Sequence, residues 1–324
     1  MIQKIKYMVK SALTAAKVYD LMTATKYEPN RLLGEIVRNT HSIEKGLSLE
    51  SVRLGFGYAK IKEAAGIVER FGELNGGSID VEQVGMFASA LSDYIKFHNE
   101  RQFASGQFDE IKDIYRRIEE RLTASAEKLG GALKVVRPHY TEAERAAIER
   151  VISERHSVRE FEKTTVSDGD LRSAIELAMR CPSACNRQCY RVTVVDRADM
   201  HLLDGILDGV GGFADQIDKL LIITGRVSDY RLSEHFQHIV SASVFAAYLT
   251  ITLQTYGIGC CFIQRQVLPC EKYDRVSKKL GIPGDDQWVC VLGIGNLKSE
   301  YRAPVSHRLS YDEIVRTVRK RSMT

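Results

Sequence analysis

The sequence predicts a chain of two regions, all-helical over residues 1–130 and mixed helix and strand over residues 141–324. Apolar residues recur at helical spacing through the first region, whereas short apolar strands alternate with amphipathic helices in the second. A chain of 324 residues also exceeds one average domain. The piece between the regions, residues 131–140, contains Pro138 and is predicted to be an extended linker.

The first region opens on a basic amphipathic segment, residues 1–20, which carries apolar side chains on one side and four lysines around the rest. We interpret it as a surface helix packed on its own domain, with contact to a membrane surface as the alternative. Further helices are predicted over residues 31–45, 58–71, 81–98 and 107–129, the last ending at Gly130-Gly131.

The second region carries clear helix starts. Thr141 and Glu144 form a capping-box pattern that opens a helix over residues 141–154, and Ser167 caps a helix that runs to Met179. Strands are predicted over residues 191–195, 220–224 and 288–294, and further helices over residues 233–256, 269–280 and 311–321.

Composition excludes several classes of protein. The net charge is only +4, and basic residues do not interleave with aromatic ones, so we predict no nucleic-acid partner. The longest apolar run, residues 239–259, is broken by serines and threonines, which favours a buried helix over a membrane span. No signal peptide is visible, and seven cysteines without a framework spacing indicate a reducing, cytoplasmic location.

Four residues within one short stretch predict a phosphate site. Arg155 and Arg159 offer guanidinium forks, Ser157 offers a hydroxyl donor, and His156 adds a further potential cation. Guanidinium groups bind phosphate oxygens in a bidentate manner, and a neighbouring hydroxyl adds a donor. The alternative is a cluster that only satisfies a helix end and nearby carboxylates.

A loop of small residues follows about 25 residues later, a spacing typical of compact elements. It spans residues 181–190 and carries the amides of Asn186 and Gln188, which can both donate to and accept from the edge of a heterocycle. The alternative for these amides is a local turn. A phosphate site followed by such a loop predicts a phosphorylated planar cofactor.

The order of five stretches resembles the nitroreductase family, the FMN-dependent flavoenzymes that use NAD(P)H. The resemblance covers about residues 141–324 and rests on residues 155–161, 182–188, 257–261 and 292–293 and on Ser306-His307-Arg308. It implies an α+β fold with a central, mainly antiparallel sheet flanked by helices. It also implies an intertwined homodimer with two FMN sites at the subunit interface, with helix 233–256 in its core.

The resemblance assigns roles to the basic residues. Arg155 and Ser157 match phosphate ligands of the family, Arg308 matches a late arginine that completes the set, and His156 lies beside the ribityl phosphate. Arg159 matches the cation at the N1/O2 side of the isoalloxazine. A cation there stabilises the anionic reduced flavin, because it lies where negative charge develops.

The resemblance also places the loop residues. Asn186 matches the amide at the pyrimidine edge, with Gln188 as a second amide, and Pro182 and Ser183 match residues that reach the ring from the other subunit. Gln264 and Arg265 replace a frequent Glu-Gly pair at flavin N5.

Two further departures follow. Ser306 stands where many members have lysine, and Cys189-Tyr190 replaces Pro-Trp. These departures leave FMN binding expected and question broad activity on nitroaromatics.

The implied activity is hydride transfer from NAD(P)H through flavin N5 to an electron-poor small molecule, in a ping-pong scheme. The flavin does the chemistry, so no side chain is expected to act as a catalyst. The absence of a GxGxxG motif agrees with the lack of a separate dinucleotide domain. Two alternatives stay open, a flavin-dependent dehydrogenase or oxidase of a biosynthetic intermediate, and a non-enzymatic dimerisation or regulatory module.

Three other clusters allow more than one interpretation. Arg38, His41 and Lys45 share a helix face. One interpretation is a solvated face or an internal ion-pair network. The other is a group that closes over the cofactor site and positions the substrate or the nicotinamide phosphate. Cysteines recur every fourth residue within residues 181–189, and two histidines share a face within residues 235–238. Neither has the spacing or companions of a metal site, so we predict loop and helix packing and no metal.

Overall fold

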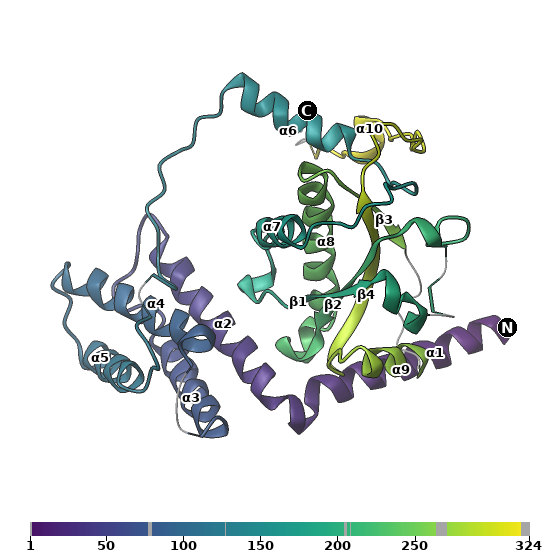
Figure 1. Cartoon of the computed structure of the whole chain (residues 1–324). Helices are drawn as coiled ribbons and strands as arrows, with labels where there is room; N and C mark the ends of the chain where they lie inside the picture. Colours follow the sequence, from purple (N-terminus) through teal and green to yellow (C-terminus); the bar gives the residue numbers. More distant parts are fainter. Residues whose placement is uncertain are drawn as a thin grey trace, which may run out of the picture.

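The computed structural model describes residues 2–76, 80–126, 128–203, 206–207, 209–263 and 271–318. Helices fill the chain up to Glu119, and a four-stranded sheet with flanking helices follows. Figure 1 places the helical part beside the sheet part, joined by α1 and α2 along one edge and by extended chain leading to α6 along another. The predicted α+β class with a helical N-terminal region is confirmed.

The elements lie in the expected order along the chain. The α-helices are α1 (Ile2–Thr23), α2 (Glu28–Leu47), α3 (Tyr58–Leu74), α4 (Val81–Asn99), α5 (Gly106–Glu119), α6 (Glu142–Glu154), α7 (Asp168–Ala178), α8 (Gln237–Thr255), α9 (Glu271–Lys279) and α10 (Tyr311–Ile314). The strands are β1 (Tyr190–Asp196), β2 (Lys219–Arg226), β3 (Ile258–Ile263) and β4 (Asp286–Asn296). Short 3-10 helices are η1 (Thr25–Tyr27), η2 (Ala184–Asn186), η3 (Arg197–Leu203), η4 (Ala214–Gln216), η5 (Val227–Asp229) and η6 (Leu232–Glu234).

Helices α2 to α5 pack around a core of their own. Phe87, Tyr94 and Phe108 are among its largest fully buried side chains. The Tyr94 hydroxyl donates to the Phe56 carbonyl at 2.8 Å, so its polar end is satisfied inside the apolar core. The Ser105 hydroxyl accepts the N–H of Phe108 and caps α5, as a serine at this position does.

The helix expected over residues 107–129 was wrong beyond Glu119, where α5 ends. The chain turns because Leu122 packs back on the helical core instead of continuing along the helix axis. Gly130 then lies so close to α4 that a Cβ there would be 2.3 Å from the Met86 carbonyl oxygen. This close approach requires glycine and fixes the turn toward the linker.

The sheet has the strand order β1-β2-β4-β3, and every neighbouring pair is antiparallel. Strand β2 is buried on both faces, which explains its nearly continuous apolar sequence. Leu221 and Ile223 belong to the core on the side of α7 and α8, and Leu220 and Ile222 belong to the opposite core. This alternation follows from the two-residue period of a strand.

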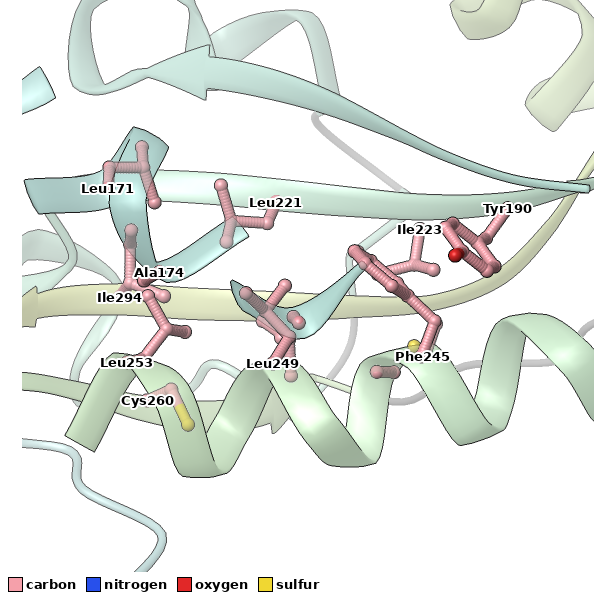
Figure 2. Close-up of a cluster of buried hydrophobic side chains, with 14 of the residues drawn as sticks. Leu171, Ala174, Tyr190, Leu221, Ile223, Phe245, Leu249, Leu253, Cys260 and Ile294 are labelled. Carbon is pink, nitrogen blue, oxygen red and sulfur yellow. The ribbon is translucent and has the colours of Figure 1, made fainter. Parts of the chain in front are cut away.

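The core between the sheet and helices α7 and α8 is drawn in Figure 2. Leu221 and Ile223 of β2 lie over Phe245 and Leu249 of α8 in that view. The Tyr190 ring stacks on the Phe245 ring, with centroids 4.3 Å apart. This packing fixes the start of β1, and hence the end of the loop that precedes it, against α8.

Two further predictions need correction. No strand was predicted over Ile258–Ile263, but these residues form the edge strand β3, because Gly257 takes a left-handed conformation that ends α8 and reverses the chain. The closing helix predicted over residues 311–321 ends at Ile314 in α10, before the β-branched Val315. Residues 319–321 lie outside the described residues.

Much apolar surface remains exposed outside the sheet body. The linker contributes Leu133 and Val136, helix α6 contributes Ile148 and Ile152, and the tail reaches Val318, which is 98% exposed. Exposed apolar patches of this extent are typical of surfaces that pack against another molecule. No helix in the described part of the chain combines the length and apolar character needed to cross a membrane.

Candidate functional site

Residues 155–161, here called the clamp segment, run beside the edge strand β3. Ser157 forms a parallel bridge with Cys260, and the Val158 N–H donates to the Cys260 carbonyl at 3.0 Å. The segment therefore extends the sheet by one short piece of backbone. Backbone hydrogen bonds hold the segment at Val158. The side chains of Arg155 and Arg159, on either side of that point, are therefore available for a ligand.

Two glycines make room for the aromatic residue that fastens the clamp segment. Phe161 is buried, and a Cβ on Gly295 would lie 2.6 Å from its Cγ atom. A Cβ on Gly259 would lie 3.2 Å from the same ring and 3.3 Å from Cβ of Val158. Gly259 of β3 and Gly295 of β4 thus serve the packing of Phe161, and through it the position of Arg159.

The two arginines of the clamp segment have no carboxylate partner in the described part of the chain, whereas its own Glu160 pairs with Lys298 at 3.4 Å. Within the described residues, no carboxylate pairs with Arg155 or Arg159, and neither the His156 ring nor the Ser157 hydroxyl has a hydrogen-bonding partner. Arg159 donates only to the Ser157 carbonyl at 3.5 Å. The alternative in which these side chains satisfy nearby carboxylates and backbone therefore finds no carboxylate among the described residues, and only Arg159 contacts a backbone carbonyl.

The second predicted element, residues 182–188, contains backbone conformations that are unusual for residues with side chains. Cys185, Asn186 and Gln188 have φ values of 52°, 56° and 47°. Non-glycine residues adopt this left-handed region at a cost, and such positions cluster at ligand sites. The Ser183 hydroxyl accepts the Gln188 N–H at 3.0 Å and closes the loop on itself.

A buried ion pair holds this loop in place. The Arg187 side chain is fully buried and donates to both carboxylate oxygens of Glu234, at 3.0 and 3.2 Å. Its guanidinium also lies 4.6 Å from the centre of the Tyr230 ring. The Ala184 N–H donates to the Ser241 hydroxyl of α8 at 3.2 Å. The loop residues beside Arg187 are thereby presented on a rigid base, a role that sequence analysis missed.

A cluster of charges lies where α2 meets the sheet. Asn30 of α2 accepts from Arg226 at 3.2 Å and donates to Asp285 at 2.9 Å. Asp229 lies 3.6 Å from Arg226, and burial raises the pKa of Asp229 to about 7, although Arg226 opposes that rise. Gly34 packs on the same segment, where a Cβ would be 2.4 Å from the Asp229 carbonyl oxygen. This junction is architectural, and its residues were not predicted.

The clamp segment and the loop lie toward opposite ends of the sheet within one chain. Tyr190, which follows the loop, aligns across β2 with Gln287 of β4, whereas Ser157 aligns across β3 with Ile294. The two β4 positions are separated by about 23 Å, at roughly 3.3 Å per strand residue. A single chain therefore does not bring the two elements together around one small ligand.

The remaining site predictions have varied outcomes. Pro182 is exposed, and Arg308 lies in the exposed tail, where it donates to the carbonyl of Ser306. Gln264 and Arg265 lie outside the described residues. The roles of all these residues stay predictions.

The cysteines and histidines are engaged in packing. Burial raises the pKa of Cys189 to about 11 and those of Cys260 and Cys290 to about 12, so these thiols stay protonated near neutral pH. His238 shares a 2.8 Å hydrogen bond with the Gln287 side chain. The described residues contain no group of three or more His, Cys, Asp or Glu that could hold a metal ion.

The polar face of α2 forms ion pairs, in agreement with one of its two interpretations. Arg38 donates to Glu35 at 2.8 Å, and His41 lies 3.1 Å from Glu44. Glu35 also pairs with Arg231, which precedes η6. Burial works against the charged form of Glu35, yet these two arginines leave its pKa below the ordinary value.

The comparisons with known proteins agree with the resemblance. Residues 152–239 match the model of the Nitroreductase family. That stretch contains both the clamp segment and the loop of residues 182–188, so the resemblance to this family is confirmed. The family match points to an oxidoreductase in general terms. A comparison with curated proteins finds no match.

Solved structures resemble roughly half of the chain. An FMN-dependent nitroreductase from Clostridium difficile is 21% identical, with a TM-score of 0.43, and the match covers 52% of this chain and 98% of that one. A nitroreductase-like family protein from Bacillus cereus is 18% identical, with a TM-score of 0.44 and coverages of 56% and 99%. A nitroreductase family protein from Streptococcus pneumoniae is 18% identical, with a TM-score of 0.43 and coverages of 52% and 99%.

Proposed function

We propose that this protein is an FMN-dependent oxidoreductase of the nitroreductase type, working as a homodimer with NAD(P)H as reductant. The observation that carries the proposal is the set of unpaired cationic and hydroxyl side chains on the clamp segment, within the stretch that matches the family. Guanidinium groups without carboxylate partners suit a phosphate, which supplies the missing negative charge.

The residues present fit the cofactor. Arg155, Ser157 and His156 would hold the ribityl phosphate, and Arg308 would add a further cation from the tail. Arg159 would face the N1/O2 side of the ring system. Bound FMN would supply the redox chemistry, accepting hydride from NAD(P)H at N5 and passing electrons to an electron-poor small molecule. The protein's contribution is binding, orientation and a positive charge near the ring.

The second subunit supplies the other half of the site in this proposal. Because the loop lies about 23 Å from the clamp segment along β4 at about 3.3 Å per residue, a loop from another chain must face the ring. The resemblance implies this for Pro182 and Ser183, and the shared rigid loop extends it to Asn186 and Gln188. The amides of those two residues suit the pyrimidine edge.

Exposed apolar surface supports the same dimer. Ile148 and Ile152 of α6 and Leu309 and Tyr311 of the tail are all more than half exposed in one chain. Val240 of α8 and Phe236, directly before that helix, are also more than half exposed. Burying such side chains against a second copy would stabilise the dimer by about 25 cal/mol per Å² of apolar area removed from water.

An absorbance spectrum of the full-length protein tests the proposal. We expect the visible bands of oxidised flavin, either as purified or after addition of FMN, and bleaching of those bands by NADH or NADPH without oxygen. Light scattering on the same sample should give the mass of two chains. A colourless protein that takes up no FMN would refute the cofactor, and flavin that neither nucleotide reduces would refute the reductant.

A further inference from the structure

Among the described residues, the apolar contacts of helix α1 with the rest of the protein come from its C-terminal end. Val18, Leu21 and Met22 join a small cluster with Val227 and Tyr230. Lys17 pairs with Asp274 of α9 at 2.6 Å. These contacts lie on one face, because residues three and four apart are neighbours on a helix. The N-terminal end of α1 reaches past α9 in Figure 1.

The apolar stripe of α1 lies on the opposite face. Ile2, Ile5, Val9 and Leu13 recur at spacings of three and four residues and are all more than half exposed, Leu13 at 66%. On an ideal helix, this stripe points roughly 170° away from the packed face. The surface helix expected to pack its apolar side on its own domain therefore packs a different side, and the apolar side faces outward.

Charge identifies the occupant of this stripe. Lys6 and Lys10 lie along one flank of the stripe, Lys4 lies on the face away from it, and no acidic residue occurs before Asp20. A second copy of the same helix would bring lysines against lysines, which is unfavourable. A surface of anionic lipid headgroups satisfies both parts of the pattern, because the apolar stripe enters the acyl boundary and the lysines meet the phosphates.

We propose that α1 docks the protein on anionic lipid bilayers, lying in the plane of the membrane surface. The apolar face over residues 2–13 is about 18 Å long at roughly 1.5 Å per residue. The attachment is peripheral and reversible, as expected for a single amphipathic helix. The proposal does not depend on the flavin chemistry.

Vesicle flotation of the full-length protein tests it. One set of vesicles is phosphatidylcholine alone, and the other contains about one third phosphatidylglycerol. We expect binding to the anionic set, at least about tenfold weaker binding to the neutral set, and release when salt is raised to about 0.5 M. The double variant Val9→Asp, Leu13→Asp should lose binding at least about tenfold.

The matched control is Leu49→Asp with Leu54→Asp, two exposed leucines outside α1 with the same change of net charge. It should bind as the unchanged protein does. Lys6→Gln should weaken anionic binding without altering the apolar stripe. Wild-type protein that does not float with anionic vesicles overturns the proposal, as does equal loss in the control.

Light scattering tests whether a second copy of the chain, instead of a lipid surface, covers the apolar stripe of α1. If Val9→Asp with Leu13→Asp reduces the oligomeric mass and wild-type protein ignores the vesicles, the stripe binds a second copy and the lipid proposal is wrong. Flavin content and reduction by NAD(P)H, measured on the same variants, report on the enzyme activity separately. Loss of lipid binding with flavin retained therefore concerns α1 alone.

Discussion

Two groups of arginines in the sheet region differ in what surrounds them. At the junction with α2, Arg187 pairs with Glu234 and Arg226 lies among buried aspartates. On the clamp segment, Arg155 and Arg159 have no carboxylate partner among the described residues. A buried charge must be paired to be tolerated, whereas a half-exposed one can wait for a ligand.

The difference separates architecture from function. Arginines whose charge is already balanced hold the loop and the helical region in place. The arginines of the clamp segment have no carboxylate partner among the described residues, and we propose that the phosphate of FMN is their ligand. Substitutions at the two groups should therefore affect different measurements, stability in one case and ligand affinity in the other.

The largest effect is expected for Arg187→Ala. It leaves Glu234 without its partner, empties a fully buried site and removes the guanidinium from the Tyr230 ring. Breaking a buried pair in this way costs about 3–5 kcal/mol, and the 28% exposure of Glu234 places this case at the lower end. Urea unfolding measures it; a change below about 1 kcal/mol would contradict the structural role.

Arg155→Ala should do the reverse. Its stability should change by less than about 0.5 kcal/mol, the usual range for surface positions. Its affinity for FMN should fall by about 1.5–3 kcal/mol, the range of a charge-assisted hydrogen bond. Fluorescence titration with FMN measures the loss. Arg150→Ala on exposed α6 is the matched control, and equal affinity loss there would remove the distinction between the two groups.

Gly295→Ala tests whether the packing of Phe161 on Gly295 holds the clamp segment in position. The added Cβ would lie 2.6 Å from the Phe161 ring, so the clamp segment must shift. We expect a loss of about 1–3 kcal/mol in the free energy of unfolding from overpacking. Gly66→Ala on α3 is the control, since nothing lies within 4 Å of its Cβ and helical alanine should add about 0.5–1 kcal/mol.

The smallest expected effect is on pH dependence. The folded protein keeps a proton on Asp229 up to about pH 7, whereas the model-peptide pKa is 3.8. The folded state thus binds more protons between these values, so the free energy of unfolding falls as pH rises through that window. Asp229→Asn removes this contribution. Its unfolding free energy should therefore fall less between pH 4 and 7 than that of the wild type, which urea unfolding at the two pH values measures.

Local signals predicted most helices and several of their ends. The capping box at Thr141 and the serine cap at Ser167 both occur as predicted. Strand β3 was missed because Ile258-Gly259-Cys260-Cys261 continues an apolar helix without a strong strand pattern. Helix α5 was predicted too long because packing of Leu122 on the helical core, not local propensity, decides where it ends.

The candidate site was only partly accessible from sequence. Local clustering revealed the clamp segment, because its four chemical groups lie within five residues. The anchor of the loop joins Arg187 to Glu234, and the junction joins Asn30 to Asp285, so neither leaves a pattern in any short window. Interactions between residues so far apart in sequence depend on the tertiary fold and cannot be inferred from spacing.

Because its side chain is a single hydrogen atom, Gly34 allows α2 of the helical region to lie directly against the sheet region. Helix α2 packs directly on the Asp229 backbone at Gly34, so the size of the side chain at position 34 sets how closely the two can approach. Any larger residue at position 34 would clash with the Asp229 carbonyl oxygen. An alanine at this position would therefore force either α2 or the Asp229 segment to move, at the place where the helical region meets the sheet region.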